Sequence, residues 1–234
     1  MSNAKSMNIG NKPKWRSCPR RLIVAGPARN VTLNVAGGLA ALVVIFGAWI
    51  GWDLVLKDRL ATKRWGVVEQ GLIYRSGRLP LDRAQVTLAN HQIRVLIDLT
   101  EPKPDNRVQS KERAAAVALG IEYHNFPLIG DGTGDINSYA QAIAVMHRAR
   151  REGKRVLVHC AAGAQRTGGV VAAYRVLVER KLPDEARVEM QRYGWKPGKD
   201  QVLLNYLNRN MAKLAELLLA LHVIDAIPNP LPVL

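Results

Sequence analysis

Short apolar runs alternate with stretches of helical spacing along most of the chain from residue 65 onward. The runs rich in β-branched residues predict strands, and the stretches with three- and four-residue steps predict helices. The predicted strands are 72–74, 94–99, 121–128 and 155–159, and the predicted helices are 81–91, 110–119, 136–151, 167–180, 183–193 and 201–222. Because strands and helices alternate, we predict an α/β domain over residues 65–234 with an open, mostly parallel sheet flanked by helices.

One apolar run is longer than the others and has no polar face. The chain carries no charge from Asn30 to Trp52, and residues 35–52 are almost wholly apolar. At about 1.5 Å per residue, a helix over this run approaches the hydrocarbon thickness of a bilayer, about 30 Å. Trp49 and Trp52 fit the aromatic belt of a membrane interface. We therefore predict one transmembrane signal-anchor helix over residues 35–56, with a buried core helix as the alternative.

The net charge of +15 is spread unevenly along the chain. Residues 1–34 contain seven Lys or Arg residues and no acidic residue, and their polar composition predicts a basic, disordered tail. The positive-inside rule places this tail in the cytoplasm and residues 65–234 on the opposite side of the membrane, as in a single-pass protein. Because so much of the charge lies in the tail, we expect a membrane and phosphorylated substrates as partners, and no nucleic acid.

The most distinctive residues for chemistry lie between a predicted strand and a predicted helix. Residues 155–168 read RVLVHCAAGAQRTG, in which five residues separate Cys160 from Arg166. A loop that leads into a helix N-terminus can turn successive backbone N–H groups toward one anion, which the helix dipole also favours. The residues predicted to bind that anion are Ala161, Ala162, Gly163, Ala164, Gln165 and Arg166.

Three side chains of this segment have predicted chemical roles. The field of the loop favours the thiolate form of Cys160, which is the nucleophilic form. Arg166 offers a planar fork for two phosphate oxygens and balances charge that develops in the transition state. The hydroxyl of Thr167 is placed to hydrogen-bond the sulfur and to ease its departure in a second step.

The segment resembles the signature loop of the cysteine-dependent protein tyrosine phosphatase superfamily and is most similar to its dual-specificity branch. The resemblance covers residues 65–234 and implies a phosphate monoester hydrolase that forms a cysteinyl-phosphate intermediate. It implies Cys160 as nucleophile, Arg166 as phosphate-binding arginine and Thr167 as the following hydroxyl. A phosphorylated protein is the implied substrate. A phosphorylated lipid or small molecule such as an inositol phosphate remains an alternative, as does a catalytically weak phosphate-binding module.

The resemblance also implies an aspartate on an upstream loop as general acid. Such an acid protonates the leaving oxygen and later accepts a proton from the attacking water. Asp131 and Asp135 are the candidates, in the string FPLIGDGTGDI. We favour Asp131 because it follows the predicted strand 121–128 most directly. Asp135 remains the alternative general acid, although it is also well placed to cap the helix that begins near Ile136.

We expect neither a metal nor an organic cofactor, because the cysteinyl mechanism requires none. Four histidines are scattered without the spacing of metal ligands, namely His91, His124, His147 and His222.

Apolar residues recur at three- and four-residue steps in the last predicted helix. We expect this stripe to pack on the core, with docking on a membrane surface as the alternative. Its members are Tyr206, Leu207, Met211, Leu214, Leu218 and Leu221.

Overall fold

The computed structural model describes residues 38, 40–47, 49, 62–80, 82–103 and 105–234. The described residues before residue 50 are helical. Among the residues that the structure describes, no helix is both long enough and apolar enough to cross a membrane. The predicted tail, 1–34, and much of the predicted span, 35–56, lie outside the described residues.

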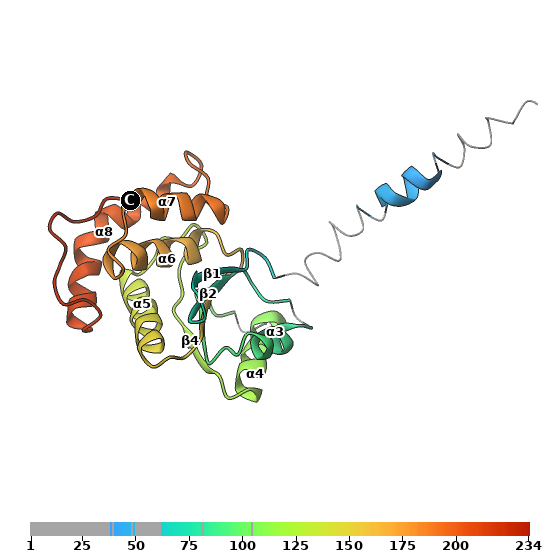
Figure 1. The fold of residues 1–234 in the computed structure, drawn as a ribbon, viewed down its shortest axis with the longest axis horizontal. Helices are drawn as coiled ribbons and strands as arrows, with labels where there is room; N and C mark the ends of the chain where they lie inside the picture. The colour runs from blue at the N-terminus through green and yellow to red at the C-terminus, as the bar shows by residue number, and fades with distance from the viewer. Residues whose placement is uncertain (1–37, 39, 48, 50–61, 81, 104) are drawn as a thin grey trace, which may run out of the picture. The chain divides into compact units, whose positions relative to one another are not determined.

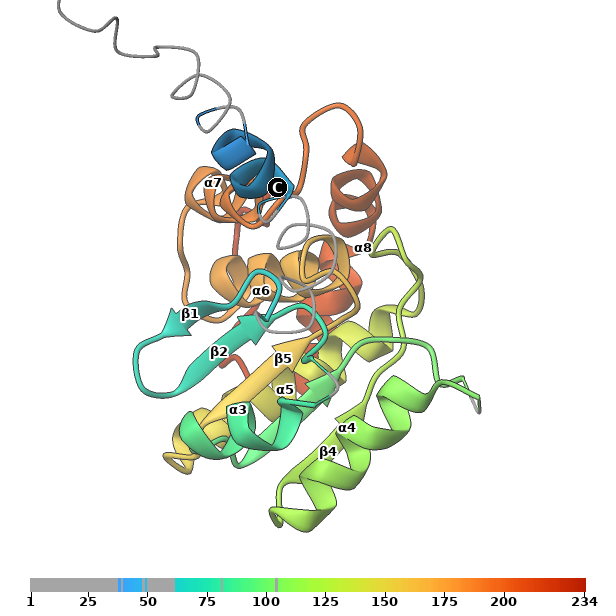
Figure 2. The same ribbon diagram turned by 90° about the vertical axis from the view of Figure 1, so that its right-hand side faces the viewer.

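A five-stranded sheet forms the centre of the domain (Figures 1 and 2). The strands lie in the spatial order β1-β2-β5-β3-β4. Only β1 runs antiparallel, along the edge of the sheet, and the other neighbouring strands are parallel. The predicted α/β fold with a mostly parallel sheet is therefore confirmed. The strands are β1 (Gly66–Glu69), β2 (Ile73–Ser76), β3 (Val95–Asp98), β4 (Glu122–Asn125) and β5 (Val156–His159).

Six helices complete the described domain and cover both faces of the sheet (Figure 2). Helices α3 and α4 pack on one face, and α5, α6 and α8 pack on the other, with α7 beside α6. The helices are α3 (Ala84–Asn90), α4 (Arg107–Ala118), α5 (Ile136–Arg151), α6 (Gln165–Leu177), α7 (Pro183–Arg192) and α8 (Gln201–Ala220).

Successive side chains of each central strand enter two different apolar cores. Val95 and Ile97 lie in the core beneath α5, α6 and α8, whereas Leu96 lies in the core with α3 and α4. The same alternation places Val156 and Leu157 of β5 in opposite cores. Because both faces are buried, these strands appear in the sequence as continuous apolar runs.

The carboxyl ends of three parallel strands meet at one edge of the sheet. The register pairs Ser76 of β2 and Asp98 of β3 with His159 of β5, so these residues lie side by side across the sheet. Helix α6 begins at Gln165, two residues earlier than predicted, so that Arg166 and Thr167 lie in its first turn. The loop between β5 and α6 therefore lies at the edge of the sheet where the carboxyl ends of β2, β3 and β5 meet.

Candidate active site

The loop between β5 and α6 folds back on its first residue. Cys160 follows β5 directly, and its side chain is buried. The backbone N–H of Gly163 donates a hydrogen bond to Cys160 Sγ over 3.1 Å. A donor at this position stabilises a negative charge on the sulfur, which is the reactive form of a cysteine.

Three successive carbonyl groups of this loop face away from its centre. The carbonyl of Ala161 accepts from the backbone N–H of Arg78 (3.1 Å), and that of Ala162 accepts from Arg64 Nη1 (2.8 Å). The carbonyl of Gly163 accepts from Arg75 Nη2 (3.0 Å). Because these acceptors are bonded outside the loop, the amide groups between them can face its interior, as in anion-binding nests.

Gly163 is the residue that allows the loop to approach the end of β2. Its φ of +76° lies in the left-handed region, and an added Cβ would lie 2.5 Å from the backbone nitrogen of Gly77. Any side chain at position 163 would therefore meet backbone atoms, which cannot rotate away.

The arginine that donates to the carbonyl of Gly163, Arg75, is itself buried. Arg75, on β2, is fully buried and lies over the ring of Tyr193, with Nη1 at 3.8 Å from Glu189 Oε1. Burial lowers the pKa of Arg75 to about 10, although Glu189, Tyr193 and Cys160 act against this shift. The guanidinium therefore stays cationic at neutral pH.

Arg166 has an unpaired donor inside the site. Its Nε is buried and has no hydrogen-bond partner among the described residues. A buried guanidinium donor without a partner is costly, and an oxyanion bound in the loop would supply the missing acceptor.

The two candidate acids have different surroundings. Asp135 is the N-cap of α5, and its Oδ1 accepts hydrogen bonds from the backbone (2.9 Å) and side-chain (2.8 Å) nitrogens of Asn137. Asp131 precedes Gly132, where an added Cβ would lie 3.3 Å from the carbonyl carbon of Gln165. The structure thus brings the Asp131 loop against the start of α6 and gives Asp135 a capping role.

Tyr139 has both Asp131 and Cys160 in its electrostatic surroundings. Burial raises the pKa of Tyr139 well above its ordinary value, and Tyr206, Cys160 and Asp131 add to the shift. Cys160 and Asp131 therefore both lie within electrostatic reach of one phenol, whereas Asp135 acts on Tyr206 instead.

The hydroxyl of Thr167 lies deeper than its predicted role requires. Thr167 is fully buried, and its Oγ1 donates to the carbonyl oxygen of Ser76 over 3.5 Å. This long bond leaves the predicted contact between Thr167 and the sulfur as a prediction.

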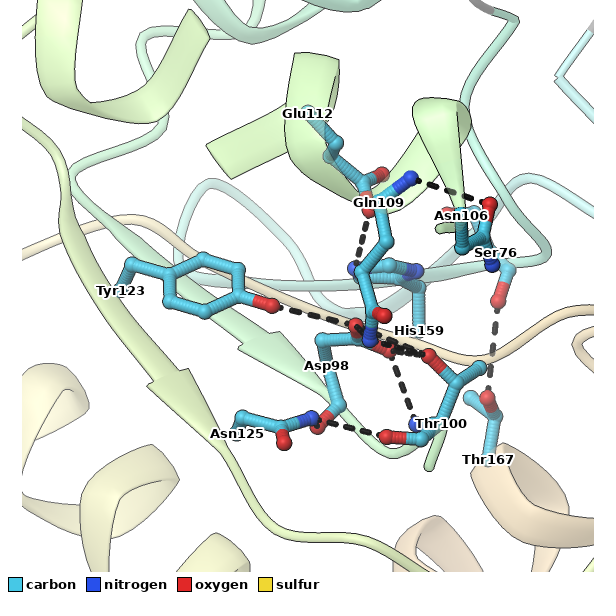
Figure 3. A network of polar contacts seen from close by, with 10 residues as sticks. All are labelled: Ser76, Asp98, Thr100, Asn106, Gln109, Glu112, Tyr123, Asn125, His159 and Thr167. Carbon is cyan, nitrogen blue, oxygen red and sulfur yellow. Dashed lines mark hydrogen bonds and ion pairs between the residues drawn. The ribbon is translucent and has the colours of Figure 1, made fainter. Parts of the chain in front are cut away.

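A buried polar network lies at the ends of β3 and β5, on the α4 side of the sheet (Figure 3). His159 Nε2 lies 3.4 Å from Glu112 Oε2, and both side chains are buried. Burial acts to raise the pKa of Asp98, but His159 and hydrogen bonds from Thr100 and Gln109 outweigh it, so the pKa lies below its ordinary value. Burial raises the pKa of Glu112, although His159 opposes the shift.

The same network contains residue types that bind metals. Asp98, Glu112 and His159 place three such atoms within 4.8 Å of one another, which the sequence spacing did not indicate. The carboxylate of Asp98, however, already accepts hydrogen bonds from Thr100, Gln109 and the hydroxyl of Tyr123. A cation would have to displace these donors, so we interpret the cluster as an ion-pair network.

Comparisons with known proteins agree with this site. Residues 81–192 match the family model described as "Dual specificity phosphatase, catalytic domain". The protein tyrosine phosphatase domain-containing protein 1 of Bos taurus is 36% identical over 151 residues, or 61% of this chain, and that of Mus musculus is 38% identical over 72 residues, or 31%. The matched regions make up only 17% and 10% of those two proteins.

Solved structures show the same fold. The crystal structure of TpbA from P. aeruginosa is 25% identical, covers 65% of this chain and 88% of its own, and has a TM-score of 0.51. The catalytic core of SIW14 from S. cerevisiae is 17% identical, covers 66% of this chain and 92% of its own, and also has a TM-score of 0.51.

The fold and the family match are similar to those of cysteine-dependent phosphatases. Within that class, residues 81–192 are similar to the dual specificity phosphatase catalytic domain. The resemblance that the sequence predicted is confirmed.

Several residues around the site were not assigned to it from the sequence. Tyr139, Glu112 and Arg64 come from three separate segments, and no local motif marks them. The sequence offered one indirect signal, the expected parallel sheet, in which the carboxyl ends of strands lie together. That signal does not show which side chains of the neighbouring helices face those strand ends.

The close approach of Gly163 to Gly77 predicts a specific cost for a side chain. We expect Gly71→Ala, which has the same φ of +76° and no atom within 4 Å of its added Cβ, to cost only the left-handed strain of about 1–2 kcal/mol. Gly163→Ala should cost about 1–3 kcal/mol more, because its Cβ meets backbone atoms. Urea unfolding of both variants measures the difference, and equal losses would show that the approach does not constrain the loop.

The low pKa of Asp98 predicts a pH-dependent contribution to stability. The stabilisation is fully present above the ordinary aspartate value of 3.8 and is lost as the pH falls through the lower folded-state pKa. We expect Asp98→Asn to lower the free energy of unfolding by about 2 kcal/mol at pH 7 and by progressively less toward pH 3. Denaturant titrations across this range measure the effect, with exposed Asp82→Asn as the control. A difference that does not change with pH would contradict this account.

Proposed function

We propose that this domain hydrolyses phosphate monoesters through a cysteinyl-phosphate intermediate. The main observation that supports this proposal is the hydrogen bond from Gly163 N–H to Cys160 Sγ. At the end of the same loop, the buried Nε of Arg166 has no hydrogen-bond partner among the described residues. This arrangement would supply a nucleophile, a group of amide donors and a cationic donor within one short segment, as the transfer of a phosphoryl group requires.

In the first step, the thiolate of Cys160 attacks phosphorus. The S–P bond forms while the ester P–O bond breaks, and Arg166 and the loop amides hold the non-bridging oxygens. The carboxyl group of Asp131 gives its proton to the leaving oxygen, so that an alcohol or phenol departs.

In the second step, water removes the phosphoryl group from the sulfur. The carboxylate of Asp131 accepts a proton from the water as its oxygen attacks phosphorus. The S–P bond breaks, inorganic phosphate leaves and the Cys160 thiolate returns, stabilised by Gly163 N–H and by the proposed contact with Thr167. These steps use no metal and no organic cofactor.

The favoured substrate is a phosphotyrosyl or dual-specificity protein site. The matched family and the names of the mammalian relatives support this class, and TpbA has been crystallised in complex with pTyr. The interior of the loop, 161–165, contains no lysine, which argues against a very highly charged substrate.

A lipid or inositol phosphate is the second candidate. The exposed side chain of Arg64 is bonded to the carbonyl of Ala162, so a cationic group lies at the edge of the loop and would attract a further anionic group of the substrate. SIW14 is described as a PP-IP phosphatase, and its likeness to this chain concerns the fold.

We also propose that residues 35–56 anchor the protein in a membrane with the N-terminus in the cytoplasm. Support comes from the uncharged run and the basic tail. The described residues of the run are helical, and an exposed apolar helix favours a nonpolar environment. More than 60% of the surface of each of these side chains is exposed: Leu42, Val43, Val44, Ile45 and Phe46.

The proposed mechanism predicts different effects for the two aspartates. We expect the Cys160→Ser protein to lose turnover, and Asp131→Asn to lower kcat by about 10²-fold, the scale of general acid catalysis. Asp135→Asn, the matched control, should retain most activity, because it loses only part of a helix cap. Phosphate release from phosphotyrosyl, phosphoseryl, inositol and lipid phosphates is measured for each variant. The losses test the roles of Cys160, Asp131 and Asp135, and the preferred substrate identifies the substrate class.

The outcomes separate the alternatives. A greater loss in Asp135→Asn than in Asp131→Asn would reverse the assignment of the acid. A wild-type protein that binds phosphorylated ligands but releases no phosphate would identify a phosphate-binding module instead.

The proposed membrane orientation predicts which cysteine positions a reagent can reach. In the Cys160→Ser protein, Cys18 is the only cysteine. A membrane-impermeant maleimide should label Cys18 only after cells are lysed. The control adds Lys213→Cys at an exposed position of the domain, which should be labelled in intact cells. The reverse pattern would invert the orientation, and recovery of the protein without membranes would refute the anchor.

A further inference from the structure

Two tyrosines from different helices are bonded to the loop that carries Asp131. Tyr139 of α5 donates its hydroxyl hydrogen to the carbonyl oxygen of Gly132 over 2.5 Å. Tyr206 of α8 donates in the same way to the carbonyl oxygen of Gly134 over 2.7 Å. The two ring centroids are 6.1 Å apart, so both phenols reach the loop from the same side of the sheet.

The loop itself is a tight reversal of the chain. Ile129 N–H donates to the carbonyl of Thr133 (2.8 Å), and Gly132 N–H donates back to the carbonyl of Ile129 (2.9 Å). Leu128 and Gly134 close the loop through an antiparallel bridge. Fixing two carbonyls of so short a loop therefore fixes the backbone between them.

The Asp131 side chain depends on this backbone for its position. Asp131 is exposed, so packing does not hold it. Its Oδ1 accepts hydrogen bonds from the backbone N–H (2.9 Å) and hydroxyl (2.8 Å) of Thr133. Thr133 lies between Gly132 and Gly134, the two residues whose carbonyls the tyrosines bind.

The residues around the Asp131 loop and the Tyr139 hydroxyl are closely packed, so that two glycines there have no room for a side chain. An added Cβ on Gly169 of α6 would lie 2.5 Å from the hydroxyl oxygen of Tyr139. An added Cβ on Gly132 would lie 2.8 Å from Leu203 Cδ1 of α8. Helix α8 thus contacts the loop through both Leu203 and Tyr206.

We propose that Tyr139 and Tyr206 are positioning residues that hold Asp131 over the phosphate-binding loop through Gly132, Gly134 and Thr133. Helix α8 lies beyond residues 81–192, which match the family model, and it nevertheless supplies half of this support. The inference rests on the proposed function, because it concerns how the general acid reaches the leaving group.

A general acid matters most when the leaving group is poor, and this gives a specific test. The full chain is assayed with 4-nitrophenyl phosphate, a good leaving group, and phenyl phosphate, a poor one. We expect Tyr206→Phe and Tyr139→Phe to lower kcat/KM for phenyl phosphate by about tenfold or more, because the acid is misplaced. For 4-nitrophenyl phosphate, the loss should stay under about threefold, because that leaving group needs less protonation.

Tyr174→Phe is the matched control. Tyr174 is a buried tyrosine of α6, and Glu179, Arg150 and Glu69 are among the charges that act on its pKa. Any loss in this variant should be equal for the two esters. Equal losses for both esters in Tyr206→Phe, or no loss, would overturn the inference. Should Tyr139→Phe fail to fold, Tyr206→Phe decides, because Tyr206 is only partly buried.

A double-variant comparison tests whether the tyrosines act through Asp131. Adding Tyr206→Phe to Asp131→Asn should lower activity by less than about twofold, because coupled residues are not additive. Adding it to Asp135→Asn should still produce the tenfold loss on phenyl phosphate. Full additivity with Asp131→Asn would overturn the inference while leaving the phosphatase activity in place. A wild-type protein that hydrolyses neither ester would refute the proposed function itself.

Discussion

The hydrogen bond from Gly163 N–H to Cys160 Sγ is the contact on which the rest of the site depends. It can form only if the loop after β5 turns back on itself, and that turn requires its carbonyl groups to find partners outside. Arg78, Arg64 and Arg75 provide those partners from the segment around β2. Strand β2 and the segments that flank the antiparallel pair β1–β2 therefore supply the donors that shape the loop: Arg75 lies in β2, Arg64 precedes β1 and Arg78 follows β2. The lack of a side chain at Gly163 lets the two segments meet.

Charged residues lie near Cys160 and the end of β5 on both faces of the sheet. Arg75 contributes a buried cation that is itself paired with Glu189 and stacked on Tyr193, so its desolvation is partly offset. On the other face of the sheet, His159 contacts Glu112, and Asp98 lies beside it with hydrogen bonds to its carboxylate. Arg75, Asp98 and His159 lie at the ends of the parallel strands β2, β3 and β5. The two apolar cores fix the positions of these strands. The electrostatics of the site thus follow from the sheet order rather than from the loop alone.

Sequence patterns were sufficient for the parts of the fold that are local. The run 94–99 and the run 155–159 were long and apolar enough to mark β3 and β5. The strand–loop–helix order predicted around Cys160 is also present in the structure. Strand β1 was missed because its four residues, one of them a glycine, form no clear pattern. Glu112 and Tyr139 were missed for a different reason. Each lies in a helix whose periodicity shows only that it packs on the sheet, and their polar partners come from segments far away in the chain.

Tyr206 shows how one helical stripe serves both packing and chemistry. Leu207, Met211, Leu214 and Leu218 are buried, so this part of the predicted stripe packs on the core. The prediction was wrong for Leu221, which is exposed at the C-cap of α8. Tyr206 lies at the edge of that stripe, where its ring packs against the core and its hydroxyl still reaches a polar partner. The apolar residues therefore fix the rotation of α8, and that rotation aims the hydroxyl at Gly134. Because the bonded carbonyl belongs to the loop of Asp131, core packing of a distant helix is transmitted to the position of an exposed carboxylate.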